Sequence, residues 1–423
     1  MADFDINDYK SSDYNRPEED YVFQIKGREY QGFTYVYDQD SVLFKVLDFG
    51  DNFLNAIRGY YKMLHNVELP DVKLFVIDAP NSVNAFARYE KSLNAYCIGV
   101  FSGACYSMEK NVEESFKNVL GVLIPEEKAA IRYGQIFIQA IRFFVAHEYA
   151  HIVCGHVTEN DEDVYLEFAD DEKSDEENLL QQMKEFQADQ MAMAFLCGMA
   201  YQDADNRVRI SMKWFEENEK RMWNEYQPNF PDDIRKLMTE GKRKRYRSQL
   251  DEKMKSMVHH DLQMIMGGVN VAFYTMDCNR KNAIKTYAKE HKITKETQES
   301  FYFQSGLATI KKFDHPLPSI RLDAVIRIMD ENIERNEPID KIEQWENDVA
   351  DFVWVVEIHR NEFNLGELYC HIAHTPTAQD FIQEMDQLWQ KEKNKFPALL
   401  PPLERLFYAN RIVDMSDEGV LIR

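Results

Sequence analysis

The sequence predicts an α+β fold that is mainly α-helical, with a small β-sheet beside one long buried helix. Runs rich in aromatic and β-branched residues, separated by turn residues, lie between residues 33 and 101 and indicate short strands. From about residue 124 onward, apolar residues recur at three- and four-residue spacing, which indicates helices. A chain of 423 residues is also long enough to bury a large hydrophobic core.

The first elements are expected to alternate strands with one helix. Short strands are expected at 33–36 and 41–46 around a polar turn, followed by a helix at 51–64 whose apolar residues share one side. Two further strands are expected at 72–78 and 95–101. We expect 95–101 to be an edge strand that pairs with an extended peptide, and a purely structural sheet is the alternative.

The next helix carries the chemistry of the chain. Its segment 136–146 is almost wholly apolar, which predicts a buried helix ending near Gly155. His147 and His151 lie four residues apart and therefore share one face of this helix. Two imidazoles so placed can bind one zinc ion, and Glu148 beside them can hold a water on that metal. A metal would explain why polar side chains occupy a buried helix.

A zinc site that hydrolyses amides needs a third protein ligand and an open position for water. Glu185 is the expected ligand, because it lies on a separate apolar helix at 179–199. Asp189 shares its face and can accept a hydrogen bond from a zinc-bound histidine. A histidine six residues after the second one would be another ligand, but that position is Val157. His156 would point away from the metal if the helix continued, so we do not expect it to be a ligand.

These motifs resemble those of a known class of enzymes. The sequence HEYAHIVCGH at 147–156, followed by EFQAD at 185–189, resembles the gluzincin metallopeptidases, especially the family of the HtpX heat-shock protease and the CAAX prenyl protease. VNAFA at 83–87 resembles the NAFA segment of that family, and His315-Pro-Leu-Pro-Ser-Ile-Arg321 resembles its HPxxxxR. A weaker resemblance is to the Lit type of phage-exclusion peptidase. The chain departs from the integral members of the first family because it has no membrane spans.

The resemblance implies a zincin-like (gluzincin) core with a bound Zn²⁺ ion. It implies that His147, His151 and Glu185 are the metal ligands. It also implies that Glu148 is the general base that takes a proton from the water and passes it to the leaving amine. Asp189 would then accept a hydrogen bond from a zinc-bound histidine and so orient its ring.

Five further residues take their expected roles from the same resemblance. His315 and Arg321 would bind the substrate carbonyl or the oxyanion, and the alternative is a loop histidine and a surface arginine. Asn84, Ala85 and Phe86 would face the substrate.

The predicted domain organisation has three parts. Residues 1–19 are charged and poor in aliphatic side chains, which predicts a disordered acidic N-terminus. The zincin-like metallopeptidase domain is expected at 20–335 and a helical C-terminal extension at 336–423. Within the domain, the insert 158–178 is strongly acidic. It could gate the site or bind a regulatory partner, as could the extension, whereas a loop without a role of its own is the plainer interpretation.

Charge and composition exclude several classes of function. A net charge of −23 argues against a nucleic-acid partner, and the basic run 242–247 is expected to be a solvated helix face. The sequence contains no run of 18 apolar residues and no signal peptide, so we expect a cytoplasmic protein without a membrane partner. The six cysteines form no CxxC pair, which favours free thiols.

Three functions are compatible with these observations. The leading prediction is a zinc-dependent endopeptidase that hydrolyses a cytoplasmic protein or peptide. The second is a regulatory or interaction protein whose zinc site is structural or vestigial. The third is a latent protease of the Lit type, in which the acidic insert covers the cleft until a partner displaces it.

Overall fold

The computed structural model describes residues 21–36, 38–123, 126–159, 165–166, 175–226 and 231–294, together with single positions at 297, 318, 321, 322, 325, 376, 380, 381, 383, 384, 387 and 391. The described part is mainly helical and carries one small sheet, which confirms the predicted α+β, mainly α class. The predicted disordered N-terminus, His315 and almost all of the extension 336–423 lie outside the described residues.

The described residues form two compact units. One runs to Leu196 and resumes at Met264, and the other is Cys197–Gln263. The first unit contains the sheet and the predicted metal site. The domain boundaries expected from the sequence stay a prediction.

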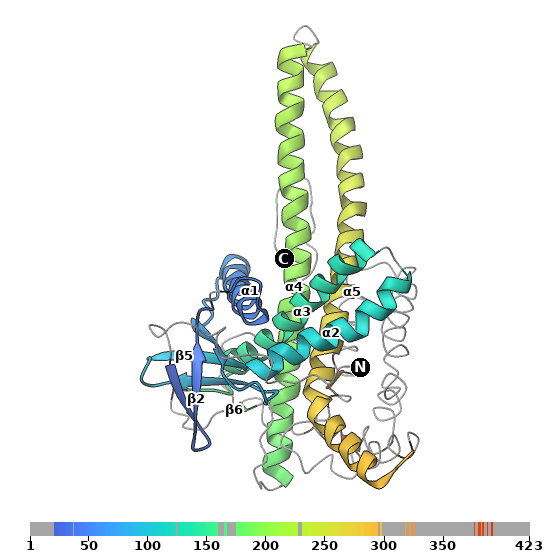
Figure 1. Cartoon of the computed structure of the whole chain (residues 1–423). Helices are drawn as coiled ribbons and strands as arrows, with labels where there is room; N and C mark the ends of the chain where they lie inside the picture. Colours follow the sequence, from blue (N-terminus) through green and yellow to red (C-terminus); the bar gives the residue numbers. More distant parts are fainter. Residues whose placement is uncertain are drawn as a thin grey trace. The chain divides into compact units, whose positions relative to one another are not determined.

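The sheet has six strands in the order β1-β2-β3-β5-β4-β6 (Figure 1). Their bounds are Tyr21–Ile25 for β1, Arg28–Phe33 for β2, Val72–Ile77 for β3, Ala85–Glu90 for β4, Ala95–Phe101 for β5 and Tyr165–Leu166 for β6. Only the β3–β5 pair is parallel among these strands, with Val72 opposite Tyr96. Lys26 and Gly27 join β1 to β2 with positive φ at both positions, as a tight two-residue hairpin requires.

Both faces of the sheet are buried along most of β3 and β5, whereas Val22 and Gln24 of β1 are exposed. On one face, aromatic and aliphatic side chains from four strands form a core cluster: Phe23, Ile25, Phe75, Ile77, Phe86, Cys97 and Phe101. The helices α1 (Val42–His65) and α3 (Glu126–Val153) contact the sheet, α1 through β3 and α3 through β4 and β5. Packing α3 on the strands in this way fixes the helix that carries His147 and His151.

Three expectations for this region were wrong. Residues 33–36 are not a strand of their own, because β2 ends at Phe33. Residues 41–46 are not a strand, because Ser41 caps α1: its Oγ accepts a hydrogen bond from the Phe44 amide at 3.1 Å. The run of apolar residues there forms the buried side of a 24-residue helix. Ala95–Phe101 is not an edge strand either, because β5 lies between β3 and β4.

The helix α3 is also held by other helices of the chain. It packs on α2 (Ser102–Leu123) and lies against α5 (Asp232–His291), where Gly268 approaches the α3 backbone. A Cβ on Gly268 would lie 2.6 Å from the amide nitrogen of Ala140, so no larger residue fits without a shift. Asn111 on α2 and Thr275 on α5 share a buried hydrogen bond of 2.9 Å.

The second unit consists of the C-terminal part of α4 (Asp175–Tyr226) and the first part of α5. Phe215 and Tyr246 stack with their ring centroids 4.6 Å apart. The basic run 242–247 lies on α5, and its first two side chains pair with α4: Lys242 lies 3.2 Å from Glu219 and Arg243 lies 2.9 Å from Glu216. Among the described helices, none is long and apolar enough to cross a membrane.

Candidate metal centre

The face of α3 that carries His147 and His151 is buried. Most of the segment 136–146 is inaccessible to solvent, and so are His147, Glu148 and His151, none of which is more than 2% exposed. Tyr149 donates a hydrogen bond to the Pro70 carbonyl at 2.8 Å, which anchors this turn of the helix. The polar residues of the motif therefore lie in the interior, where each needs a partner.

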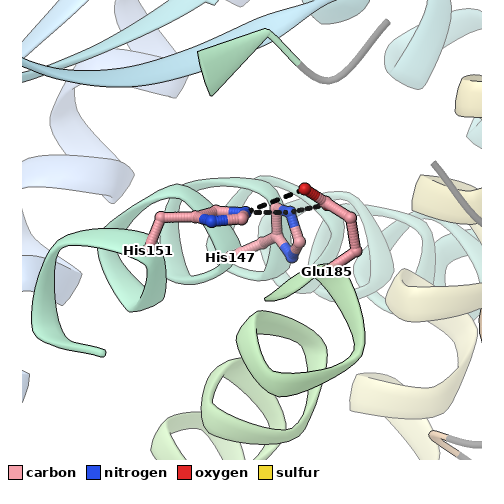
Figure 2. A group of neighbouring side chains, drawn as sticks. All are labelled: His147, His151 and Glu185. Atoms are coloured by element: carbon pink, nitrogen blue, oxygen red, sulfur yellow. Dashed lines mark hydrogen bonds and ion pairs between the residues drawn. The ribbon is translucent and has the colours of Figure 1, made fainter. Parts of the chain in front are cut away.

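Two histidines from α3 and one glutamate from α4 converge on a single point (Figure 2). The Nε2 atoms of His147 and His151 lie 3.1 Å apart. Glu185 places Oε2 at 3.1 Å from the His147 Nε2 and Oε1 at 3.5 Å from the His151 Nε2. Gln181, one turn before Glu185, donates to its Oε1 at 3.0 Å and so holds the carboxylate in this orientation.

These separations fit a tetrahedral metal ion. Zinc binds histidine nitrogen and carboxylate oxygen at about 2.0–2.1 Å, so neighbouring ligand atoms in a tetrahedron are about 3.3 Å apart. The distances of 3.1 Å from the His147 Nε2 to the His151 Nε2 and to the Glu185 Oε2 lie close to this value. With one ligand atom taken from each residue, the ligand atoms of His147, His151 and Glu185 all lie within 4.8 Å of one another, so the group could hold a metal ion.

The buried charges around this group also favour a dication. Glu148, Glu185 and Asp189 contribute three carboxylates, and Arg321 contributes one guanidinium; each of the four side chains is at most 2% exposed. When ionised, these four groups carry a net charge of −2. Buried charge is costly unless it is paired, and a doubly charged cation at the ligand atoms would balance it.

The outer nitrogen of His147, Nδ1, contacts an ion pair formed by Asp189 and Arg321. This Nδ1 lies 2.9 Å from Asp189 Oδ1, so the ring donates there and keeps Nε2 free for a metal. Arg321 binds both oxygens of Asp189 in bidentate fashion, with Nε at 2.8 Å and Nη2 at 2.9 Å. Its Nη2 also lies 3.4 Å from both ring nitrogens of His147. The guanidinium also lies over Phe273, 5.2 Å from the ring centroid.

His151 is supported by neutral groups. Its Nδ1 lies 3.0 Å from the Nδ1 of His156, whose Nε2 lies 2.8 Å from the Gln187 Oε1. Burial, above all, holds the pKa of His156 well below its usual range, so this ring is uncharged at neutral pH. His156 therefore contacts the candidate ligand His151. The distance of 3.0 Å is about the same as the 2.9 Å between Asp189 and His147.

The end of α3 explains how His156 reaches His151. Gly155 has φ +71°, its amide donates to the Ile152 carbonyl at 3.1 Å, and the His156 amide donates to the His151 carbonyl at 2.8 Å. This pair of hydrogen bonds is the Schellman motif, which turns the chain back over the last helical turn. The expectation that His156 points away assumed a continuing helix, whereas the helix ends at Val153. The signal that could have shown this contact was the glycine directly before His156.

Among the described residues, the group that could hold a metal ion contains no cysteine. Burial raises the pKa of Cys154 to about 12, so its thiol stays protonated at neutral pH. The described cysteines Cys97, Cys105, Cys154 and Cys197 are all free thiols, as expected from the sequence.

The predicted substrate residues lie at the start of β4, which is placed between β5 and β6 in the sheet. Ala85 and Phe86 are fully buried, and the Phe86 ring packs on Phe23 with centroids 5.2 Å apart, so its side chain belongs to the core. Asn84 precedes β4, and its Oδ1 accepts a hydrogen bond from the Ala85 amide at 2.8 Å. On the outer side of β4, Phe86 pairs with Leu166 of β6, which comes from the acidic insert. Substrate binding by these three residues stays a prediction.

Arg321 and His315 were expected to act together on the substrate. The structure instead brings Arg321 to Asp189, and His315 lies outside the described residues. The sequence contained no signal that would pair Arg321 with a residue 132 positions earlier.

Taken together, the buried histidines and glutamate form a group that could hold a metal ion within a mainly helical fold. The profile of the Peptidase U49 family, a family of Lit-like proteases, matches residues 93–223. This range contains His147, Glu148, His151, Glu185 and Asp189, and the match indicates a peptidase with a protein or peptide substrate. No curated protein and no solved structure matches the chain.

Proposed function

We propose that this protein is a zinc-dependent endopeptidase. The observation that carries the proposal is the convergence of His147 Nε2, His151 Nε2 and the Glu185 carboxylate at separations of 3.1–3.5 Å, directly beside the buried Glu148. The Peptidase U49 match over the same residues supports peptide-bond hydrolysis. Two imidazoles and one carboxylate are a donor set that suits zinc in a catalytic site.

Three protein ligands favour catalysis over a structural role. A structural zinc site is closed by four protein ligands, whereas a catalytic site keeps one position open for water. Among the described residues, the group that could hold the metal has three members. The alternative of a regulatory protein with a structural or vestigial site therefore has less support than the enzyme.

The residues of the chain would divide the reaction between them. Bound zinc would supply Lewis acidity to the attacking water and to the substrate carbonyl. Glu148 would take the proton of that water and pass it to the leaving amine. Glu148 is 2% exposed, so bulk water has little access to its carboxylate.

Asp189 and Arg321 would act through His147. Asp189 would fix the proton of His147 on Nδ1, and Arg321 would hold Asp189 by its two hydrogen bonds. This positioning role replaces the oxyanion contact that the resemblance implied for Arg321, because the guanidinium is 1% exposed and occupied by Asp189. The role of His315 in substrate binding stays part of the proposal.

The wider resemblance supports the same reaction class. The order of HExxH, ExxAD and HPxxxxR, which the chain shares with the HtpX and CAAX prenyl protease family, fits a gluzincin arrangement with Glu185 as the third ligand. In the Lit-type alternative the reaction is the same, but the protease is inactive until a partner activates it. The substrate would be a cytoplasmic protein or peptide.

Replacement of the base tests the proposal. The substitution Glu148→Gln should leave zinc bound in one equivalent, since the three ligands remain, and should abolish cleavage. The full chain and the variant would be expressed in cells, new protein N-termini quantified by mass spectrometry, and the metal measured on the purified proteins by elemental analysis.

The matched control is Glu159→Gln, an exposed glutamate beyond the end of α3. This control should produce the same new N-termini as the unmodified chain. Identical cleavage products from Glu148→Gln would contradict the proposal.

A further inference from the structure

The outer nitrogen of His151 faces a chain of two neutral side chains. His151 Nδ1 lies 3.0 Å from His156 Nδ1, and His156 Nε2 lies 2.8 Å from Gln187 Oε1. His151 and His156 are at most 3% exposed, and Gln187 is 7% exposed. Water therefore has little access to these hydrogen bonds, and their direction is set by the side chains themselves.

The proton positions in this chain are linked. A neutral imidazole carries one ring proton, so two ring nitrogens 3.0 Å apart need one donor and one acceptor. The Gln187 oxygen can only accept, so His156 carries its proton on Nε2 and presents a lone pair at Nδ1. His151 must then donate from Nδ1, which leaves the lone pair of its Nε2 facing His147 and Glu185.

The same geometry excludes His156 as a ligand itself. Its Nδ1 meets the outer nitrogen of His151 and its Nε2 meets Gln187, so both ring nitrogens are in use. The two imidazole planes are inclined by 64° with centroids 5.0 Å apart, so the rings meet edge-on and are not stacked face to face.

We propose that His156 is a positioning residue for the metal ligand His151, and that Gln187 fixes the tautomer of His156. The two residues do for His151, without a charge, what Asp189 and Arg321 do for His147. The inference rests on the proposed metal site, but it does not depend on what reaction that site performs.

Substitutions at His156 test this role through metal affinity. In His156→Leu no acceptor remains for His151 Nδ1, and the zinc affinity should fall about 10- to 100-fold. In His156→Asn the side-chain oxygen can take the place of Nδ1, so the affinity should stay within about threefold of the original value, since the acceptor is retained. In His156→Gln the longer side chain carries its carbonyl oxygen beyond the position of Nδ1. The zinc affinity should therefore resemble that of the leucine variant.

Zinc dissociation constants would be measured on the full-length proteins by competition with a chromophoric chelator. Nitrogen-15 spectra of the zinc-loaded protein with labelled histidine would supply a second readout. They should show the proton of His151 on Nδ1 and that of His156 on Nε2. The opposite tautomers would overturn the proposal, and so would unchanged zinc affinity in the leucine variant.

The asparagine and glutamine variants keep the proposal testable if the leucine variant does not fold, because both retain a polar side chain. Equal affinity in these two variants would overturn the proposal. Failure of the peptidase proposal would show itself separately, as unchanged cleavage by Glu148→Gln, and would leave the affinity measurements intact. Absence of zinc binding by the unmodified chain would remove both proposals.

Discussion

The two histidines of the candidate metal centre present the same atom, Nε2, to the metal position, but their outer nitrogens have different hydrogen-bond partners. His147 donates to Asp189, a carboxylate held by the Arg321 guanidinium, whereas His151 is adjacent to the neutral pair His156 and Gln187. The charged support comes from residues far apart in the chain, and the neutral one begins five residues after the ligand.

This difference shows how a buried site can orient two histidine ligands without adding further buried negative charge. A second carboxylate behind His151 would raise the buried negative charge from −2 to −3, which a dication could not balance. A histidine that is kept neutral by burial and hydrogen-bonded to an amide provides the same acceptor at no cost in charge. The comparison therefore predicts that changes on the His147 side alter both metal affinity and fold stability, whereas changes on the His151 side act on the metal with a smaller effect on the fold.

The largest effect is expected for Asp189→Asn. The amide can still accept from His147, but Arg321 loses its carboxylate and stays buried. The zinc affinity should fall about 10- to 100-fold, and the metal-free protein should lose about 3–5 kcal/mol of unfolding free energy. Chelator competition and urea denaturation without metal would measure the two quantities.

The control for this prediction is the double variant Asp189→Asn with Arg321→Met, in which the unpaired cation is removed. Stability should recover in part, because the buried charge is gone, and zinc affinity should not. If Asp189→Asn were as stable as the unmodified protein, the charged partners of His147 would contribute no more to fold stability than the neutral partners of His151.

A smaller effect, confined to the other histidine, is expected for Gly155→Ala. At φ +71° an alanine costs about 1–2 kcal/mol, and the turn that places His156 against His151 should be distorted. Zinc affinity should fall by less than in Asp189→Asn. The matched control on the same helix is Gly134→Ala, where a Cβ meets no atom within 4 Å and the fold should gain about 1 kcal/mol. Equal zinc affinity in the two alanine variants would argue against a role for the turn.

The smallest effect is expected for Asp51→Asn on α1, which should leave both histidines unchanged. Partial desolvation, with a contribution from Asp48, raises the pKa of Asp51 from 3.8 to about 6. Because the folded state favours the protonated acid, the carboxyl destabilises the fold increasingly from about pH 4 to about pH 6, and constantly above that. The variant should be more stable than the parent at pH 7, by less than about 1 kcal/mol after solvent screening. Urea denaturation should show no difference at pH 4, and a difference there would exclude this assignment.

The parts of the site that follow from local periodicity could be predicted from the sequence. Four-residue spacing on a helix is enough to place His147 beside His151 and Asp189 on the face of Glu185, and the structure brings these four residues together. The mainly helical class with a small sheet was also predictable, because strand and helix patterns differ in period.

The parts that depend on order in space or on chain reversal could not be predicted in this way. The strand order β3-β5-β4 differs from the chain order, so no local pattern shows that Ala95–Phe101 is interior. The segment 41–46 has strand composition, yet the Ser41 cap and the later turns of α1 make it helical. The contact of His156 depends on a helix end that reverses the chain, and that of Arg321 on a pairing across most of the fold.

The reversal at Gly155 has a consequence for protein design. Its hydrogen bond from residue 156 to residue 151 fixes a spacing of five, so a histidine in the last helical turn, a glycine four residues later and a second histidine form a transferable segment. Grafted onto the end of another buried helix, with an amide on a neighbouring helix, such a segment could orient a metal-binding imidazole in a core that tolerates no additional carboxylate.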